Sequence, residues 1–316
     1  MIDDVFVVVR SVGERTEDAC IRIAESQLSD SSQLAIVKGI PFGEAHMESI
    51  RLALDSQAQW ALFLDADIML KDNAVETMLA EAMEIAEPFF QLNFRILDRG
   101  FGGESYGIHF YSTKYFEQAL KYKDVALISQ RPEFIVCREI AVNEGVPSIT
   151  SNTTVALHGY QQYYADLYRT TFVRSIKYSR HLDYMFRLYR DGYLSVESDD
   201  LDERFMFWGL VDGMIHGNKH DLAPLNRDFY LDNIKDIFSI LDVQEKGELM
   251  MEEGYVESVF GNHKPSDLYL QNSNWICPSH GYSVKPPERS LSGYINHLLG
   301  PRTGRIKEAI KILLGK

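Results

Sequence analysis

The sequence predicts an α/β protein with a mainly parallel sheet flanked by helices, followed by a mostly helical C-terminal region. Short apolar runs, typical of buried parallel strands, alternate with helical periodicity through the first 160 residues. This alternation is the pattern of βαβ units. Beyond about residue 181, aromatic and charged residues mix and helical spacing takes over. We therefore expect two domains, residues 1–180 and 181–316.

The predicted elements follow the apolar pattern along the chain. Thr16 is expected to cap the first helix, because the acidic Glu17 and Asp18 follow it in the first turn. Further helices are expected around residues 47–54 and 75–86. In the C-terminal region one helical face is formed by Ile234, Ile237, Phe238 and Leu241. Strands are expected at residues 5–9, 34–37, 60–64, 89–94 and 108–111.

Composition excludes several classes of protein. The formal net charge of −14 leaves no overall positive field for phosphates, so we expect no nucleic-acid partner. The three cysteines (Cys20, Cys137 and Cys277) lack paired spacing, which fits a reducing compartment. The N-terminus does not resemble a signal peptide, and no apolar run is long enough to span a bilayer. We expect a cytoplasmic protein, or one attached to the inner face of a membrane.

The stretch WALFLDADIML, residues 60–70, holds the clearest chemical signal. An apolar strand ends in Asp65 and Asp67, and ligands of parallel α/β sheets bind beyond such strand ends. Two carboxylates at this spacing suit a hard divalent cation whose coordination shell is completed by phosphate oxygens. A solvated turn is the alternative, but the preceding strand favours Mn²⁺ or Mg²⁺.

Together with VVVRSVGERT and NTTVALHGYQQYY, this stretch resembles nucleotide-sugar glycosyltransferases of the GT-A fold, of the family 2 type that contains a DxD motif. The resemblance covers about residues 3–165. It implies that the first strand and its loop hold the nucleoside and that Asp65 and Asp67 hold a metal on the diphosphate. His158 would be a further metal ligand. A core or surface histidine is the alternative for that residue.

The resemblance also implies an acidic residue that acts as base or holds the acceptor in inverting members. Its position corresponds to Glu133, twelve residues before Gly145, which lies thirteen before His158. The chain departs from the family pattern, because Pro132 stands where a second acidic residue is usual. A helix-opening Glu is the plain alternative. Glu104, in the glycine-rich FGGESYG, is the rival candidate. Glu133 as base would favour inversion over retention.

Nucleotide-sugar contacts are expected from residues at the strand ends. Arg10 and Arg15 flank the first loop, which also holds Ser11, and an arginine offers a planar fork to phosphate. Lys38 ends the second strand, where many relatives carry an acidic residue. Arg169 lies on a basic, aromatic segment after His158. Asp65 would share in nucleotide-sugar binding. Ordinary surface cations are the alternative for the basic residues.

The C-terminal tail, residues 302–316, is predicted to form a basic amphipathic helix. Its apolar face consists of Ile306, Ala309, Ile310, Leu313 and Leu314. Such a helix on an acidic protein suggests contact with an anionic membrane surface. Docking against the protein's own body or a partner subunit is equally consistent with the pattern.

The preferred interpretation is a metal-dependent glycosyltransferase that moves a sugar from a nucleoside-diphosphate sugar to a saccharide or lipid-linked acceptor. The family and the tail suggest bacterial surface polysaccharide synthesis. Three alternatives stay open. A haloacid-dehalogenase-like phosphatase would carry its DxD after the first strand and prefer Thr or Val at the place of Met69. A nucleotidyltransferase would want a richer Gly, Lys and Arg loop than SVGERT. A non-catalytic nucleotide-sugar-binding scaffold would tolerate a degenerate site.

Overall fold

The computed structural model describes residues 2–101, 103–129, 131–177, 199–216 and 227–263. These residues all belong to one compact unit, Met1–His280. The domain boundary predicted near residue 180, the amphipathic helix predicted at 302–316 and Cys277 lie outside the described residues. The division into two domains therefore stays a prediction.

Seven strands form one sheet in the described part of the chain, in the order β2-β1-β3-β6-β5-β7-β4. The pairings β1–β2, β1–β3 and β5–β7 are parallel, and the other three are antiparallel. Five strands thus point the same way, while β4 and β6 run against them. The strands are β1 (Val5–Ser11), β2 (Leu34–Lys38), β3 (Trp60–Asp65), β4 (Ile68–Leu70), β5 (Gln91–Asp98), β6 (Gly103–Ser112) and β7 (Ser148–His158).

The predicted α/β class is confirmed, and the predicted strands appear with shifted ends. The strand expected at 89–94 runs from Gln91 to Asp98, and the one expected at 108–111 is ten residues long. β4 was not expected, because three apolar residues after DAD are too few to give a periodic signal. The sheet is also more mixed than predicted, since half of its strand pairings are antiparallel.

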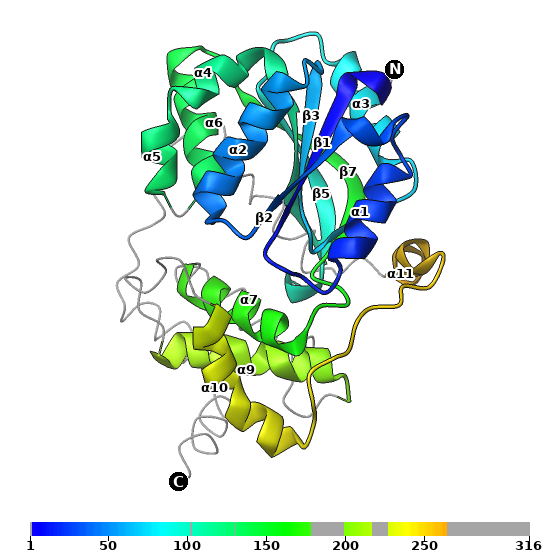
Figure 1. The fold of residues 1–316 in the computed structure, drawn as a ribbon, viewed down its shortest axis with the longest axis vertical. Helices are drawn as coiled ribbons and strands as arrows, with labels where there is room; N and C mark the ends of the chain where they lie inside the picture. The colour runs from blue at the N-terminus through cyan, green and yellow to red at the C-terminus, as the bar shows by residue number, and fades with distance from the viewer. Residues whose placement is uncertain (1, 102, 130, 178–198, 217–226, 264–316) are drawn as a thin grey trace, which may run out of the picture. The chain divides into compact units, whose positions relative to one another are not determined.

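Helices cover both faces of the sheet (Figure 1). The apolar side chains of β1 alternate between the two faces, so each face needs such a cover. Val5, Val7 and Val9 pack with α1 (Glu17–Glu25) and α3 (Ala74–Glu84). Phe6 and Val8 face the other side. The helices there are α2 (Phe42–Asp55), α4 (Phe116–Leu120), α5 (Lys123–Leu127) and α6 (Pro132–Asn143).

Three helices after β7 have a core of their own. They are α7 (Tyr164–Lys177), α9 (Leu201–His216) and α10 (Arg227–Leu241). The helical face predicted around Ile234 and Ile237 is confirmed, because both side chains are buried in this core. Helices α7 and α9 approach closely at Gly209, where an added Cβ would lie 2.1 Å from the carbonyl oxygen of Tyr168.

A last helix, α11 (Tyr255–Asn262), returns to the sheet. Val256 packs against Met69, Leu97 and Leu157 from β4, β5 and β7. Among the described residues, none of the helices has the length and hydropathy needed to cross a membrane.

Candidate functional site

The C-terminal ends of four strands meet at one edge of the sheet, because β1, β3, β5 and β7 point the same way. Register decides which residues meet there. Arg10 of β1 is paired with Asp65 of β3, and Asp98 of β5 with His158 of β7. The pairing of β4 with β7 places Ile68 opposite His158, so that Asp67 lies beside the same histidine.

The DAD turn is held by its backbone. The amide of Ala66 donates to the carbonyl of Arg10 at 2.9 Å, and the carbonyl of Ala66 accepts from the hydroxyl of Thr16 at 2.8 Å. Gln162 in turn donates to that hydroxyl at 2.6 Å. Thr16 does occupy the N-cap position of α1, but its side chain makes no capping bond. The predicted capping role is wrong, because the hydroxyl is used to fix the DAD turn instead.

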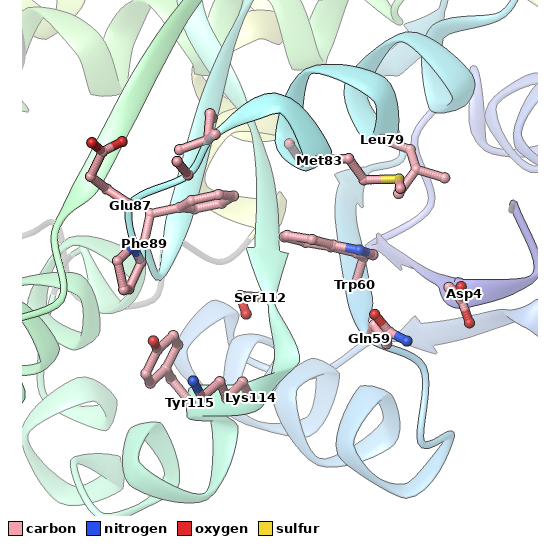
Figure 2. Close-up of a pocket in the computed structure, with 14 residues that line it drawn as sticks. Asp4, Gln59, Trp60, Leu79, Met83, Glu87, Phe89, Ser112, Lys114 and Tyr115 are labelled. Atoms are coloured by element: carbon pink, nitrogen blue, oxygen red, sulfur yellow. The ribbon is translucent and has the colours of Figure 1, made fainter.

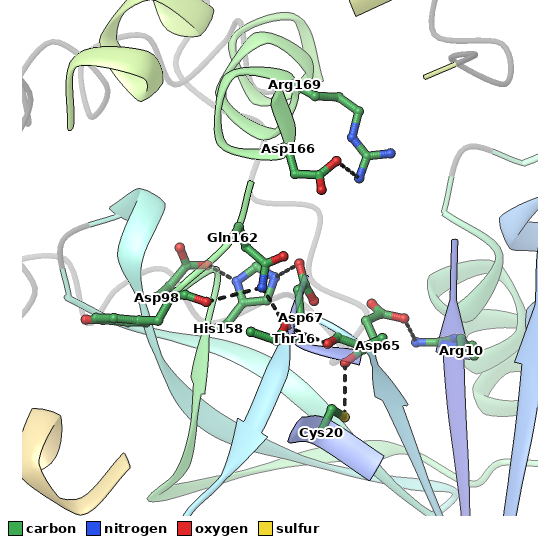
Figure 3. A network of polar contacts seen from close by, with 12 residues as sticks. Arg10, Thr16, Cys20, Asp65, Asp67, Asp98, His158, Gln162, Asp166 and Arg169 are labelled. Carbon is green, nitrogen blue, oxygen red and sulfur yellow. Dashed lines mark hydrogen bonds and ion pairs between the residues drawn. The ribbon is translucent and has the colours of Figure 1, made fainter. Parts of the chain in front are cut away.

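Asp67, His158 and Asp98 form a continuous polar network (Figure 3). Nε2 of His158 lies 3.2 Å from Oδ2 of Asp67, and Nδ1 lies 2.9 Å from Oδ2 of Asp98. Arg174 of α7 donates to both carboxylate oxygens of Asp98, at 2.9 and 2.8 Å. Asp98 is 2% exposed, so this ion pair is withdrawn from solvent. The imidazole of His158 thus has a carboxylate at each of its two ring nitrogens.

The charges of this network support one another. Burial alone would lower the pKa of His158, but the carboxylates of Asp67 and Asp98 outweigh it and raise the pKa to about 10. Burial would raise the pKa of Asp98, yet Arg174 and His158 hold it well below its usual range. The pKa of Asp67 is lowered because His158 outweighs burial. At neutral pH both carboxylates are therefore ionised and His158 is cationic when no other cation is present.

A second ion pair lies beside the first. Nη2 of Arg10 is 2.8 Å from Oδ1 of Asp65, and Nη1 is 3.7 Å from Oε1 of Glu133. The guanidinium lies over the ring of Phe42, with Cζ 4.8 Å from its centroid. Arg10 is buried, whereas the side chain of Asp65 is 39% exposed. Glu133 stands in the first turn of α6, which begins at Pro132.

Two carboxylates surround Ser11 at the end of β1, Glu14 from the following loop and Glu17 from the start of α1. The hydroxyl of Ser11 donates to Glu14 at 2.8 Å and also contacts Glu17, which forms an ion pair with Lys38. Burial and the nearby charge of Asp67 raise the pKa of Glu14. The positive charge of Lys38 is thus balanced by Glu17. The sequence singled out Ser11 and Lys38 for the site, whereas Glu17 was expected only to open the first helix and Glu14 was missed.

The other predicted site residues are spread out. Arg15 donates to the backbone carbonyls of Gly247 and Gln161, at 2.7 and 2.9 Å, and so joins the first loop to the C-terminal segment. Arg169 lies in α7, 3.7 Å from Asp166 (Figure 3). Glu104 lies in β6.

The carboxylate of Glu104 is engaged by the neighbouring strands. It is 3.3 Å from Arg95 of β5 and accepts from Thr154 of β7 at 2.7 Å. Glu133, by contrast, is linked through Arg10 to the aspartate at the end of β3. Of the two candidate bases, the structure connects Glu133 to the DAD motif.

The donor set at Asp67 fits a divalent cation. Among the described residues, Oδ1 of Asp67 is buried and has no hydrogen-bond donor. A carboxylate oxygen and an imidazole nitrogen 3.2 Å apart can share one ion. Asp65, the third predicted metal ligand, forms an ion pair with Arg10. Within the described part of the chain, no group of three or more His, Cys, Asp or Glu side chains is arranged as a metal site. A cation here would therefore need further oxygen ligands from water or a substrate.

A pocket of about 400 Å³ lies at the other end of the strands (Figure 2). It is lined by Trp60 at the start of β3, Ser112 at the end of β6, and Phe89 before β5. Because Asp65 ends β3, the length of the strand separates this pocket from the polar network. The pocket contains none of the predicted site residues, so chemistry and not cavity volume locates the candidate site.

Asp98 and its ion pair with Arg174 are the main features that sequence reasoning missed. Asp98 follows Ile96 and Leu97 as Asp65 follows WALFL, but Arg95 interrupts the apolar pattern before it, so the strand-end carboxylate gives a weaker signal. Arg174 was visible only as one cation of a basic helix. Its partner lies 76 residues earlier in the chain.

Comparison with known proteins gives structural likenesses alone. No family model and no curated protein matches the sequence. One similar structure is a glycosyltransferase involved in the glycosylation of the major capsid of PBCV-1, with 9% identity, a TM-score of 0.35, and coverage of 49% of this chain and 94% of that chain. Another is A197 from STIV, with 11% identity, a TM-score of 0.29, and coverage of 36% and 67%.

A third is described as a mannose-1-phosphate geranyltransferase from Thermus thermophilus, with 12% identity, a TM-score of 0.29, and coverage of 52% of this chain and 78% of that chain. All three TM-scores are too low to establish a shared fold. The function is therefore argued from the residues at the strand ends.

Proposed function

We propose that this protein is a metal-dependent glycosyltransferase of the GT-A type, which uses a nucleoside-diphosphate sugar as donor and a saccharide or lipid-linked molecule as acceptor. One observation carries the proposal: the buried, unpartnered Oδ1 of Asp67, within the described residues, lies on a carboxylate whose other oxygen is 3.2 Å from Nε2 of His158. The resemblance of the DAD strand to this family supplies the substrate class.

Asp67 and His158 would hold Mn²⁺ or Mg²⁺, and the donor diphosphate would complete the coordination. When bound, the cation would neutralise the charge that develops on the leaving diphosphate. A cation held there would explain why the apolar strand β3 ends in two carboxylates. Asp65, paired with Arg10, has the supporting role of keeping that strand end in register.

Glu133 is the proposed general base, which takes the proton of the acceptor hydroxyl as that oxygen attacks. Arg10 supports this role, because its guanidinium lies between Glu133 and Asp65 and fixes the carboxylate relative to the DAD motif. A base in this position gives inversion at the sugar carbon. Glu104 is less suited, because both of its oxygens are engaged by Arg95 and Thr154.

The carboxylates around Ser11 are the proposed contact for the nucleoside. Carboxylates and a hydroxyl accept hydrogen bonds from ribose hydroxyls, whereas they would repel phosphate. Ser11, Glu14 and Glu17 therefore suit the sugar of the nucleoside, and Lys38 orders Glu17. Arg169, 26% exposed and only loosely paired with Asp166, is the proposed contact for the diphosphate.

Thermal stability tests the proposal directly. The full chain is melted with UDP, GDP, CDP or dTDP, each with and without Mn²⁺, in the wild type and in Asp67→Ala. A ligand at about one hundred times its dissociation constant stabilises the native state by about 2.7 kcal/mol. We expect one nucleotide to raise the Tm only when Mn²⁺ is present, and Asp67→Ala to lose that response.

Asp55→Ala is the matched control, because this exposed carboxylate of α2 pairs with Arg51 far from the DAD motif. It should respond like the wild type. If no nucleotide stabilises the wild type in a metal-dependent way, the proposed function is wrong, and a phosphatase becomes the better explanation. Once the donor is known, Glu133→Gln should lower kcat by about 10²- to 10⁴-fold while nucleotide binding is retained.

A further inference from the structure

The clamp on His158 consists of Asp98 and Arg174 and lies behind the proposed metal ligands. We infer that Asp98, itself held by Arg174, is the positioning residue of the site: it orients the imidazole of His158 so that Nε2 faces Asp67. The effect on metal binding rests on the proposed function, whereas the orientation of the ring is independent of it.

The geometry allows His158 one orientation. Nδ1 lies 2.9 Å from Oδ2 of Asp98 and Nε2 lies 3.2 Å from Oδ2 of Asp67, so the two ring nitrogens face different carboxylates. A flip of the ring would take both nitrogens away from these oxygens. A hydrogen bond from Nδ1–H to Asp98 leaves Nε2 as the nitrogen available to a metal ion. Such outer carboxylates set the tautomer and orientation of metal-binding histidines.

Arg174 makes the clamp rigid. Its two guanidinium nitrogens bind the two oxygens of Asp98 at 2.9 and 2.8 Å, the planar fork geometry that suits a carboxylate. Gly100 leaves the room for this arrangement, since an added Cβ would lie 2.4 Å from Nη1 of Arg174. The clamp also joins α7, which carries Arg174, to the end of β5, so the position of α7 is transmitted to His158.

The first test needs no metal. In ¹⁵N-labelled full-length protein, a ring N–H bound to a buried carboxylate gives a downfield proton resonance, because it is protected from exchange with water. At neutral pH both ring N–H groups of the cationic His158 face carboxylates, so His158→Gln would remove two such resonances in the wild type. The resonance of Nδ1–H, which faces Asp98, is the one that tests the inference. Asp98→Ala should abolish it, and Arg174→Gln and Gly100→Ala should shift or broaden it. A resonance that is absent in the wild type, or unchanged in Asp98→Ala, would overturn the inference.

The second test uses Mn²⁺ alone, with the free ion measured by electron paramagnetic resonance. We expect Asp98→Ala to bind Mn²⁺ about 10- to 100-fold more weakly than the wild type. The double variant Asp98→Ala with Arg174→Gln should bind no more weakly than Asp98→Ala, because Arg174 acts through Asp98. Unchanged Mn²⁺ affinity in Asp98→Ala would refute the consequence for the metal.

Glu81→Ala is the control for the loss of a carboxylate against β7. Glu81 of α3 accepts from Ser151 at 2.6 Å and also contacts Thr153, both of them five or more residues before His158 in that strand. In Glu81→Ala, the Nδ1–H resonance of His158 and the Mn²⁺ affinity should match those of the wild type. If the wild type shows the ring resonance and Asp98→Ala loses it, but the wild type binds no Mn²⁺, the positioning of His158 stands and the proposed function fails.

Discussion

Substitution of Gly209 by Ala would separate two helices that the site depends on. An added Cβ in α9 would lie 2.1 Å from the carbonyl oxygen of Tyr168, 2.8 Å from its carbonyl carbon and 2.4 Å from the hydroxyl oxygen of Thr171. Backbone atoms of α7 cannot rotate away as a flexible side chain can. The oxygen would have to retreat by about 1.3 Å to reach an ordinary contact of 3.4 Å.

Two opposing effects set the size of the change in stability. Overpacking of a well-packed core costs about 1–3 kcal/mol, and a clash with backbone belongs at the upper end. Replacing Gly by Ala inside a helix returns about 1 kcal/mol. We therefore expect Gly209→Ala to destabilise the contact of α7 with α9 by about 2 kcal/mol.

Hydrogen exchange of the α7 amides, residues 164–177, measures the free energy of local opening. Gly261→Ala in α11 is the matched control, since nothing lies within 4 Å of an added Cβ there. It should leave the exchange of α7 unchanged. If Gly209→Ala protected α7 as well as glycine does, the close approach of the two helices would be refuted, together with the reasoning that α7 presents Arg174 to the site from a rigid position.

Three further predictions concern the polar network. Arg10→Met should lower the free energy of unfolding by about 2–3 kcal/mol, because the carboxylates of Asp65 and Glu133 lose their buried counter-charge while Asp65 stays partly hydrated. In urea unfolding, Arg10→Lys should recover part of the lost stability. Equal stability of all three proteins would contradict the ion pair. The pKa of His158 is raised from 6.5 to about 10, so its charged form contributes its full stabilisation below pH 6.5. This contribution is lost as the pH rises toward 10, by up to about 1.4 kcal/mol per pH unit. The difference in urea midpoint between wild type and His158→Gln should therefore shrink over this range, and a constant difference would argue against a cationic His158 between Asp67 and Asp98. Thr16→Val should cost about 1–3 kcal/mol by leaving a buried backbone carbonyl of the DAD turn without its donor, while Thr16→Ser should retain most of the stability; a neutral Thr16→Val would mean that the turn does not need this hydroxyl.

Elements with a strong local signal were predictable. The apolar runs of β1 and β3 are buried along their length, and a continuous apolar run indicates such a strand without knowledge of its neighbours. Asp65 and Asp67 were therefore placed correctly at a strand end. The helical faces of α3 and α10 followed in the same way from their helical spacing.

Partners distant in the chain were not predictable. Arg10 was singled out for contact with the nucleotide or diphosphate, and its ion pair with Asp65, set by the register of β1 beside β3, was not foreseen. Thr16 was expected to cap its own helix, yet packing directs its hydroxyl to Ala66. In both cases the local residue types allow several partners, and the choice among them is made by which strand or turn lies alongside.

By itself the sequence determined that strands alternate with helices and that two carboxylates stand at the end of a buried strand, because these properties depend on neighbours within a few residues. The family resemblance had placed Asp67 and His158 at one metal, but only the tertiary structure decided that Asp98 joins them in one network and that Arg174 secures it. The order of strands in the sheet brings β4, β5 and β7 together. That order is set by the packing of both sheet faces, which no single segment of the chain contains.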